Sequence, residues 1–353
     1  MERPIAGGKV GRHRAVVKVV ITGGCGFIGQ RLAARILELG SLARPDGTQA
    51  PVEEVVLFDA GSPPRLPQGI DGKVRIVTGD IADQTAVKAL IDRDDISIFH
   101  LASVVSGGGE KDFDLAMRVN LTGGLNLFEA ARARGGAAKL VFASSIAVFG
   151  GEDMSATVGD LTKQAPQTTY GTTKAICELL VNDYTRKGFF DGRSARLPTV
   201  IIRPGKANAA ASSFASAVFR EPLKGEDYTL PVDVKTPIPV IGYRAVVDGL
   251  VALHELPGQE LGADRAVSLP ALTVSVEGMI ASLRRVAAGR RLGEITVEPD
   301  PFIEGIVATW PKGTDDKRGL RLGLPADRNL DEIIAYYIED YVDGPDAALF
   351  QPS

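Results

Sequence analysis

The chain has 353 residues, a formal net charge of −4 and 24% charged residues, which are ordinary values for a globular protein with a large buried core. The acidic balance argues against a nucleic-acid binder, and no apolar run is long enough to span a bilayer. Two cysteines and three histidines exclude a disulfide framework and disfavour a metal site, so we expect a cytoplasmic protein without a metal. The basic residues 1–18 lack the apolar segment of a secretory signal.

The first half of the chain alternates β-branched runs with stretches of helical period, a pattern typical of βαβ units. A loop is expected over 41–51. The pattern predicts an α/β fold with a doubly wound parallel sheet and a ligand site at the carboxyl ends of its strands. In chain order, we expect strands at 19–22, 55–58, 74–77, 96–101, 140–143 and 199–202, and helices at 27–39, 113–134 and 168–187.

After Arg203 the chain becomes richer in small residues and proline, and its strands and helices are predicted to be shorter. We therefore expect a first domain over 1–203 and a smaller α/β domain over 204–353 that closes over the ligand site. The stretch 243–255 is predicted to be helical, and 241–256 is predicted to return to the first domain.

A glycine-rich turn joins the first predicted strand to the first predicted helix. Its glycines, Gly23, Gly26 and Gly29, have the G-x-x-G-x-x-G spacing of a dinucleotide loop, with Phe27 and Ile28 opening the helix. Such a loop needs a tight turn, a close approach of backbone to a pyrophosphate, and the partial positive charge of a helix N-terminus. The sequence therefore predicts dinucleotide binding here.

The ends of the next strands predict the rest of the cofactor groove. Asp59 follows the second strand, where a carboxylate accepts from the ribose hydroxyls and repels a 2′-phosphate, so NAD is favoured over NADP. The pair Asp80 and Ile81 is expected beside the adenine. The pair Leu101 and Ala102 is expected where the dinucleotide passes.

A proton-handling centre is predicted where the fifth strand meets the helix at 168–187. Tyr170 and Lys174 form a Y-x-x-x-K pair on one helical face, and a nearby ammonium stabilises a phenolate. Ser145, at the end of the fifth strand, is predicted to hold a substrate hydroxyl against Tyr170. Ser144 is the nearest competitor for that role.

Together with Asn120, these motifs resemble the extended short-chain dehydrogenase/reductase superfamily over nearly the whole chain, which implies a Rossmann fold and the nicotinamide cofactor NAD. The resemblance implies that Tyr170 is the base, that Lys174 also binds the nicotinamide ribose, and that Ser145 orients the substrate. The runs 170–184 and 203–216 are similar to the D-erythronate dehydrogenase family. That similarity implies NAD-dependent oxidation of a small sugar acid at C2, most simply D-erythronate to 2-dehydro-D-erythronate.

A small polyhydroxy acid needs a cation for its carboxylate and short polar side chains for its hydroxyls. The cation candidates are Lys206 and Arg244, and Arg203 is expected to brace the fold instead. The candidates for the hydroxyls are Ser106, Asn208, Ser212 and Ser213.

Two alternatives remain open at this stage. One is a nucleotide-sugar epimerase or dehydratase that keeps its NAD bound. The other is a dinucleotide-binding sensor or assembly factor, which an intact set of Ser145, Tyr170 and Lys174 disfavours. The superfamily resemblance also implies a possible homodimer through the helices at 113–134 and 168–187.

Overall fold

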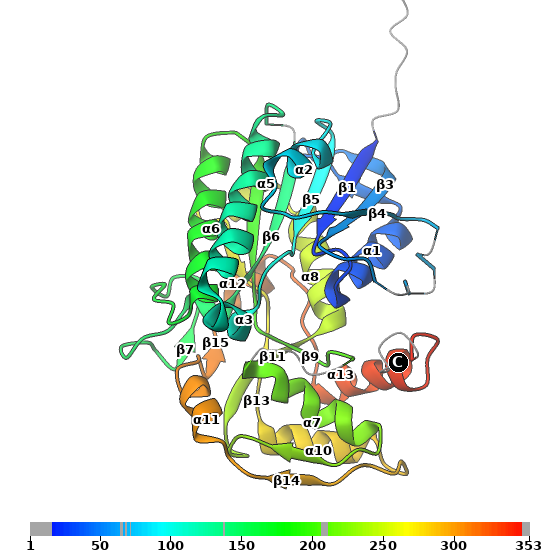
Figure 1. Ribbon diagram of the computed structural model, residues 1–353, viewed down its shortest axis with the longest axis vertical. Coiled ribbons are helices and arrows are strands. Elements are labelled where there is room, and N and C mark those ends of the chain that lie inside the picture. The colour runs from blue at the N-terminus through cyan, green and yellow to red at the C-terminus, as the bar shows by residue number, and fades with distance from the viewer. Residues whose placement is uncertain are drawn as a thin grey trace, which may run out of the picture.

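The computed structural model describes residues 16–63, 66–67, 69–70, 72–136, 138–205 and 211–347. Figure 1 shows two lobes, with a large sheet and its helices above a smaller lobe that contains most of the C-terminal part of the chain. Among the described helices, none is both long and apolar enough to cross a membrane.

Within the described residues, the large sheet has eight strands, and all its pairings are parallel except that of β2 with β3. Its order along the main path is β12-β8-β6-β5-β1-β3-β2, and β4 pairs with the second half of β3. This is the predicted doubly wound α/β sheet. Its strands are β1 (Val17–Thr22), β2 (Ser41–Ala43), β3 (Gln49–Asp59), β4 (Arg75–Thr78), β5 (Ile96–His100), β6 (Lys139–Ser145), β8 (Asp191–Leu197) and β12 (Ala266–Ser268).

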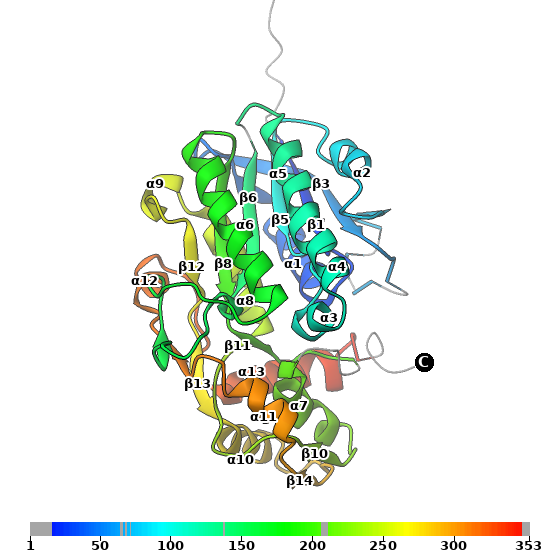
Figure 2. The same cartoon turned by 60° about the vertical axis from the view of Figure 1, so that its left-hand side comes forward.

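Helices cover both faces of this sheet (Figures 1 and 2). One apolar core joins α1 and α8 to one face, and a second core joins α5 and α6 to the other. The helical segments of this lobe are α1 (Phe27–Leu39), α2 (Gln84–Leu90), α3 (Ser106–Lys111), α4 (Phe113–Ala116), the π-helical η1 (Met117–Thr122), α5 (Gly123–Arg132), the 3-10 turn η2 (Ile146–Val148), α6 (Thr169–Arg186), α8 (Tyr243–Glu255) and α9 (Gly258–Leu261).

The smaller lobe has its own apolar core, which Phe27 and Ile28 of α1 also contact. Its elements are β9 (Thr199–Ile201), η3 (Ala211–Ser213), α7 (Phe214–Leu223), β10 (Tyr228–Leu230), β11 (Pro237–Gly242), β13 (Leu272–Ser275), α10 (Val276–Val286), β14 (Ile295–Val297), α11 (Pro301–Val307), α13 (Leu330–Tyr337) and the π-helical η4 (Ile338–Val342). At the edge of the two lobes lie β7 (Thr157–Val158), β15 (Gly313–Thr314) and α12 (Lys317–Arg321). Segments beyond residue 204 also pack with the large lobe, among them α8, which was expected there, and β12, which was not.

The prediction that residues 199–202 form the sixth strand of the large sheet is wrong. Residues 199–201 do form β9, but this strand pairs with β11 in a separate sheet of β9, β11 and β13. The sixth strand of the large sheet is β8, whose Arg193, Ser194 and Arg196 are fully buried. Arg193 donates to Asp191 at 2.6 Å, and Arg196 donates to Glu178 at 2.8 Å. These ion pairs, the first within β8 and the second with α6, allow a strand with a polar sequence to lie in the core.

Two further expectations differ from the structure. The predicted loop at 41–51 is a hairpin in which β2 pairs antiparallel with the first residues of β3. The predicted single helix at 113–134 contains a π-helical segment, η1, between α4 and α5. Such bulges often occur at functional sites. This one carries Asn120, whose side-chain oxygen accepts from the Val104 amide at 2.7 Å.

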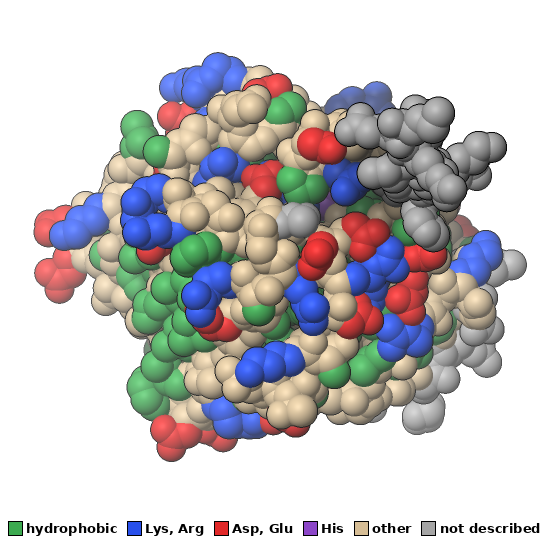
Figure 3. Space-filling model, turned by 90° about the horizontal axis from the view of Figure 1, so that it is seen from above, with side chains coloured by type: hydrophobic (Ala, Val, Ile, Leu, Met, Phe, Trp, Pro, Cys, Tyr) green, Lys and Arg blue, Asp and Glu red, His purple; other side chains and the backbone are tan. Residues whose placement is uncertain are grey.

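The exterior of the large lobe carries charges of both signs. Figure 3 shows the end of the molecule opposite the smaller lobe, where acidic and basic side chains are interspersed. The small net charge of −4 is consistent with this mixture. The carboxyl ends of the parallel strands point the other way, towards the smaller lobe (Figure 1).

Candidate active site

The glycine loop lies between β1 and α1 and leaves no room for side chains. Gly23 has a φ of +68°, and a Cβ there would lie 2.7 Å from the Ala102 amide nitrogen. A Cβ on Gly29 would lie 2.6 Å from the Gly23 carbonyl oxygen. Gly26 is exposed and caps α1 without a side-chain hydrogen bond. The loop is therefore a bare backbone cradle at a helix N-terminus, which fits a pyrophosphate.

The other predicted cofactor residues surround this loop. Asp59 accepts from the Cys25 amide at 3.1 Å, so the end of β3 is tied to the glycine loop. Leu101 donates from its amide to the Thr22 carbonyl at 3.0 Å, which holds the residues after β5 beside β1. Ile81 is buried, and Cys25 has its pKa raised to about 11, first by burial and then by Asp59. The thiol is therefore a packing group at neutral pH.

Asp80 is already engaged within the protein. Its carboxylate accepts from the Ala82 amide at 2.9 Å and pairs with Arg118, and these contacts lower its pKa. Arg118 is a residue that the sequence did not single out. It lies on η1, two positions before Asn120, and it brings a guanidinium to the place predicted for the adenine.

The three predicted catalytic residues lie together. Ser145 caps η2, where its hydroxyl accepts from the Ala147 amide at 3.1 Å, and its side chain lies close enough to the phenol of Tyr170 to affect the pKa of that group. Burial raises the pKa of Tyr170 above its ordinary value of 10, and the hydrogen bond from Ser145 opposes that rise. A donor at this position favours the phenolate.

Lys174 lies one helical turn after Tyr170. Its Nζ donates to the Ala143 carbonyl at 2.7 Å and lies 4.7 Å from the centre of the Phe142 ring and 5.5 Å from that of Tyr170. Burial lowers the pKa of Lys174 to about 8, against the opposing effects of Cys177 and Glu178. The ammonium therefore lies near the phenol, and its pKa is only slightly above neutral pH.

Gly171 explains how the helix and the strand end meet. A Cβ at this position would lie 2.1 Å from the Ala147 carbonyl oxygen, so only glycine allows α6 to approach η2 this closely. The neighbouring hydroxyl of Thr168 caps α6 by accepting from the Gly171 amide at 3.0 Å. The sequence contained this glycine inside the Y-x-x-x-K run, but its role depends on a tertiary contact.

The predicted substrate residues are only partly brought together. Ser106 opens α3, which packs on the start of α6, where Glu110 accepts from the Thr169 amide at 2.8 Å. Ser212 and Ser213 lie on η3 in the smaller lobe. Lys206 and Asn208 lie outside the described residues.

Arg244 does not offer a free charge. Its guanidinium pairs with Asp340 at 2.7 Å and with Glu339 at 3.0 Å, and it lies 4.1 Å from the centre of the Tyr336 ring. These contacts fasten α8 to the C-terminal helices. Its predicted role as the carboxylate cation therefore has no support from the geometry.

His100 is held within the core of the large lobe. Its Nδ1 lies 2.6 Å from the Thr22 hydroxyl, and burial lowers its pKa to about 3. Ser144, the alternative to Ser145, is buried and has no hydrogen-bond partner for its hydroxyl among the described residues. Ser145 is thus the serine that contacts Tyr170.

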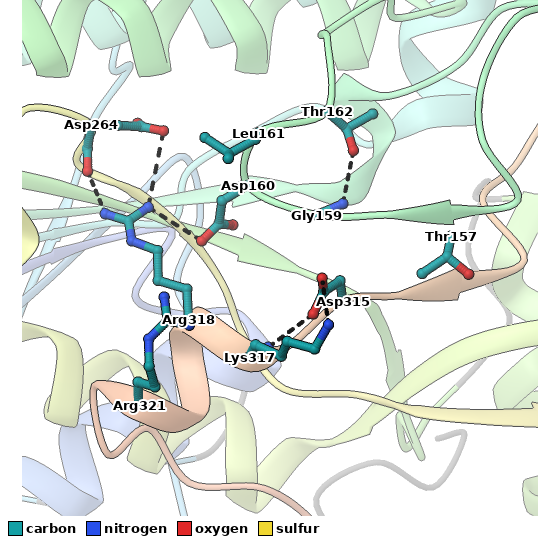
Figure 4. A pocket seen from close by; sticks show the side chains of 10 residues that line it. All are labelled: Thr157, Gly159, Asp160, Leu161, Thr162, Asp264, Asp315, Lys317, Arg318 and Arg321. Carbon is teal, nitrogen blue, oxygen red and sulfur yellow. Dashed lines mark hydrogen bonds and ion pairs between the residues drawn. The ribbon is translucent and has the colours of Figure 1, made fainter.

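A pocket of about 650 Å³ opens elsewhere, between the segment 157–162 and α12. Figure 4 shows its basic side chains, among which Arg318 is joined to Asp160 and Asp264, and Lys317 to Asp315. Its charges are largely paired within the protein. The pocket is separate from the Ser145, Tyr170 and Lys174 site.

Comparison with known proteins agrees with this arrangement. Residues 19–260 match the NAD dependent epimerase/dehydratase family. The chain belongs to that family. It is 46% identical to the D-erythronate dehydrogenase of Cupriavidus necator, over 92% of this chain and 98% of that protein. It is 39% identical to the D-erythronate dehydrogenase of Haemophilus influenzae, over 92% of this chain and 99% of that protein.

Solved structures of the family have the same fold. A protein from Agrobacterium tumefaciens described as a nucleoside-diphosphate-sugar epimerase is similar with a TM-score of 0.85 and 36% identity, over 97% of this chain and 99% of that one. An L-threonine dehydrogenase from Cupriavidus necator has a TM-score of 0.77 at 24% identity, over 90% of this chain and 98% of that one. The second likeness concerns the fold alone.

Proposed function

We propose that the protein oxidises a small sugar acid at C2 with NAD, and that its substrate is D-erythronate, which becomes 2-dehydro-D-erythronate. The observation that carries the proposal is the 46% identity to a D-erythronate dehydrogenase over nearly the full length of both chains. The contact between Ser145 and Tyr170, with Lys174 one turn away, supports it because oxidation of an alcohol needs a base for the hydroxyl proton.

The bare glycine cradle and the carboxylate of Asp59 would hold NAD at the carboxyl edge of the sheet. When bound, NAD supplies the acceptor for the hydride that leaves C2. Tyr170, as phenolate, removes the proton from the C2 hydroxyl, so the C–H and O–H bonds break as the C=O bond forms. Ser145 holds the substrate oxygen beside the phenol, and the ammonium of Lys174 stabilises the phenolate.

The decisive experiment is NADH absorbance with purified protein, NAD and four- to six-carbon sugar acids, with UDP-sugars in parallel. We expect NADH with D-erythronate and none with UDP-sugars. The name of the Agrobacterium protein favours a nucleotide-sugar epimerase as the second candidate. Tightly bound NAD, no net NADH and conversion of a UDP-sugar would establish that reaction instead.

We also propose that the protein is a cytoplasmic homodimer that associates through α4–α5 and α6. Phe113 on α4 is 60% exposed and Leu179 on α6 is 61% exposed, which supports an apolar contact with a second copy. Size-exclusion chromatography with light scattering measures the mass directly. A monomer at micromolar concentration would contradict the dimer.

A further inference from the structure

A sugar-acid carboxylate needs a cation, and the two candidates chosen from sequence do not supply one in the described structure. Arg244 is paired with Asp340 and Glu339, and Lys206 lies outside the described residues. Among the described residues, another cation near the junction of the two lobes could serve the carboxylate if the protein acts as proposed above. Arg203, which was expected only to brace the fold, has the required properties.

The position of Arg203 follows from the strand before it. β9 ends at Ile201, which lies opposite Gly242 in the register with β11. The next residue, Tyr243, places its ring 5.3 Å from that of Phe27, the first residue of the helix that follows the glycine loop. The chain at 201–203 therefore passes through the junction close to the cofactor cradle (Figure 1).

The backbone of Arg203 is anchored independently of its side chain. Its amide donates to the Ser216 hydroxyl at 3.1 Å, and its carbonyl accepts from Arg220 at 3.0 Å. Both partners lie on α7 of the smaller lobe. The fold thus positions this residue through main-chain contacts and leaves the guanidinium available.

The charge of Arg203 is not neutralised within the described part of the chain. Its side chain is partly buried and has no acidic partner there, whereas Arg220 beside it pairs with Glu221. Burial and the nearby charge of Arg220 both lower the pKa of Arg203. An unpaired, desolvated guanidinium costs free energy, and an arriving anion recovers part of that cost.

We propose that Arg203 binds the carboxylate of the sugar-acid substrate and so selects acids over neutral polyols; this rests on the proposed function. A guanidinium matches a carboxylate through two parallel hydrogen bonds. The other anion expected at this junction is the cofactor pyrophosphate. The glycine loop and the N-terminus of α1 would bind it, so it does not need Arg203.

The test compares wild-type enzyme with R203Q, R203K and the exposed control R291Q. We expect R203Q to raise KM for D-erythronate about 100-fold, in line with the loss of a charge-assisted pair, and R203K to raise it less. The dissociation constant for NAD, measured by calorimetry, should change less than twofold in every variant. Because the hydrogen bonds of Arg203 to described residues come from its main chain, both Arg203 variants should fold, which thermal melting checks.

A second readout separates binding from a structural role. Millimolar guanidinium added to R203A should restore part of the lost kcat/KM with D-erythronate and leave R291Q unaffected. An unchanged KM for D-erythronate in R203Q, or a loss confined to NAD binding, would overturn the inference while the proposed function stands. Wild-type protein that forms no NADH from any sugar acid would refute the proposed function, and this inference with it.

Discussion

The amide of Cys25 donates a 3.1 Å hydrogen bond to the carboxylate of Asp59, which ties the glycine loop to the end of β3. The same carboxylate accepts from the Ala60 amide at 2.8 Å, so both of its oxygens are held in place. An acid fixed beside a dinucleotide loop should bind ribose hydroxyls and exclude a 2′-phosphate.

We therefore expect Asp59→Ser to raise KM for NAD at least tenfold and to improve the use of NADP. The measurement is the ratio of kcat/KM for the two cofactors at saturating sugar acid. The half-buried strand residue Glu54 provides a control, because Glu54→Gln removes a charge from β3 away from the loop and disturbs only its pair with Arg75. An unchanged ratio of kcat/KM for the two cofactors in Asp59→Ser would show that Asp59 stabilises the glycine loop and does not select the cofactor.

Tyr170→Phe should lower kcat by a factor of about 1,000 or more, because the phenol oxygen is the only part removed and general base catalysis has this magnitude. NAD binding, measured by calorimetry, should survive. Thr172→Val on the exposed side of the same helix turn is the matched control and should keep most activity. Near-normal turnover in Tyr170→Phe would rule out this residue as the base.

Gly171→Ala should separate Tyr170 from Ser145, since its Cβ would lie 2.1 Å from the Ala147 carbonyl oxygen. We expect kcat to fall at least tenfold and the melting temperature to drop. Gly305→Ala is the control, because a Cβ on that helical glycine meets nothing within 4 Å. If Gly171→Ala were as active and stable as Gly305→Ala, the close approach of α6 and η2 would not matter for the site.

Glu178 lies one turn beyond Lys174 and is buried with Arg196, which donates to it at 2.8 Å. Removing its charge should lower the pKa of Lys174 below about 8, because Glu178 opposes the effect of burial. Activity that needs the ammonium is lost as pH rises through that pKa, so Glu178→Gln should shift the alkaline limb of kcat to lower pH.

The same substitution removes the closest acidic partner of the buried Arg196 and leaves Asp160 at 3.7 Å, so it should cost up to about 3 kcal/mol of stability in urea unfolding. Asp183→Asn, which breaks an exposed pair with Arg186 on the same helix, should cost less than about 1 kcal/mol. A pH profile identical to that of the wild type would show that Glu178 has no influence on Lys174.

Asp327 accepts from the Gly242 amide at 2.6 Å at the start of α8, and burial raises its pKa to about 6. Because the folded pKa is higher than the unfolded one, folding binds a proton, and stability falls as pH rises from about 4 to about 6. Asp327→Asn removes this loss and retains an acceptor for Gly242. It should be more stable than the wild type at pH 7 by at most about 3 kcal/mol, with little difference at pH 4. Equal stabilities at pH 7 would contradict the raised pKa.

Local sequence patterns were sufficient to predict features that depend on interactions between residues a few positions apart. The bounds of α1 and α8 and the spacing of Tyr170 and Lys174 follow from helical periodicity and glycine placement. The doubly wound sheet follows from the order of apolar strands and helices. β8 was missed because its buried arginines also have partners on other elements, Glu178 of α6 for Arg196 and the His254 carbonyl of α8 for Arg193, which no local pattern reveals.

The sequence by itself determined the α/β fold, and it predicted the dinucleotide loop and the three proposed proton-handling residues from short motifs and their order along the chain. Only the tertiary structure shows how the charges of two described arginines are compensated. Arg244 and Arg203 both qualify by residue type, but Asp340 and Glu339 neutralise Arg244, whereas Arg203 has no acidic partner in the described structure. Opposite charges attract through space, and Arg244 lies about 95 residues from its acidic partners along the chain. The pairing is therefore evident only in the folded protein.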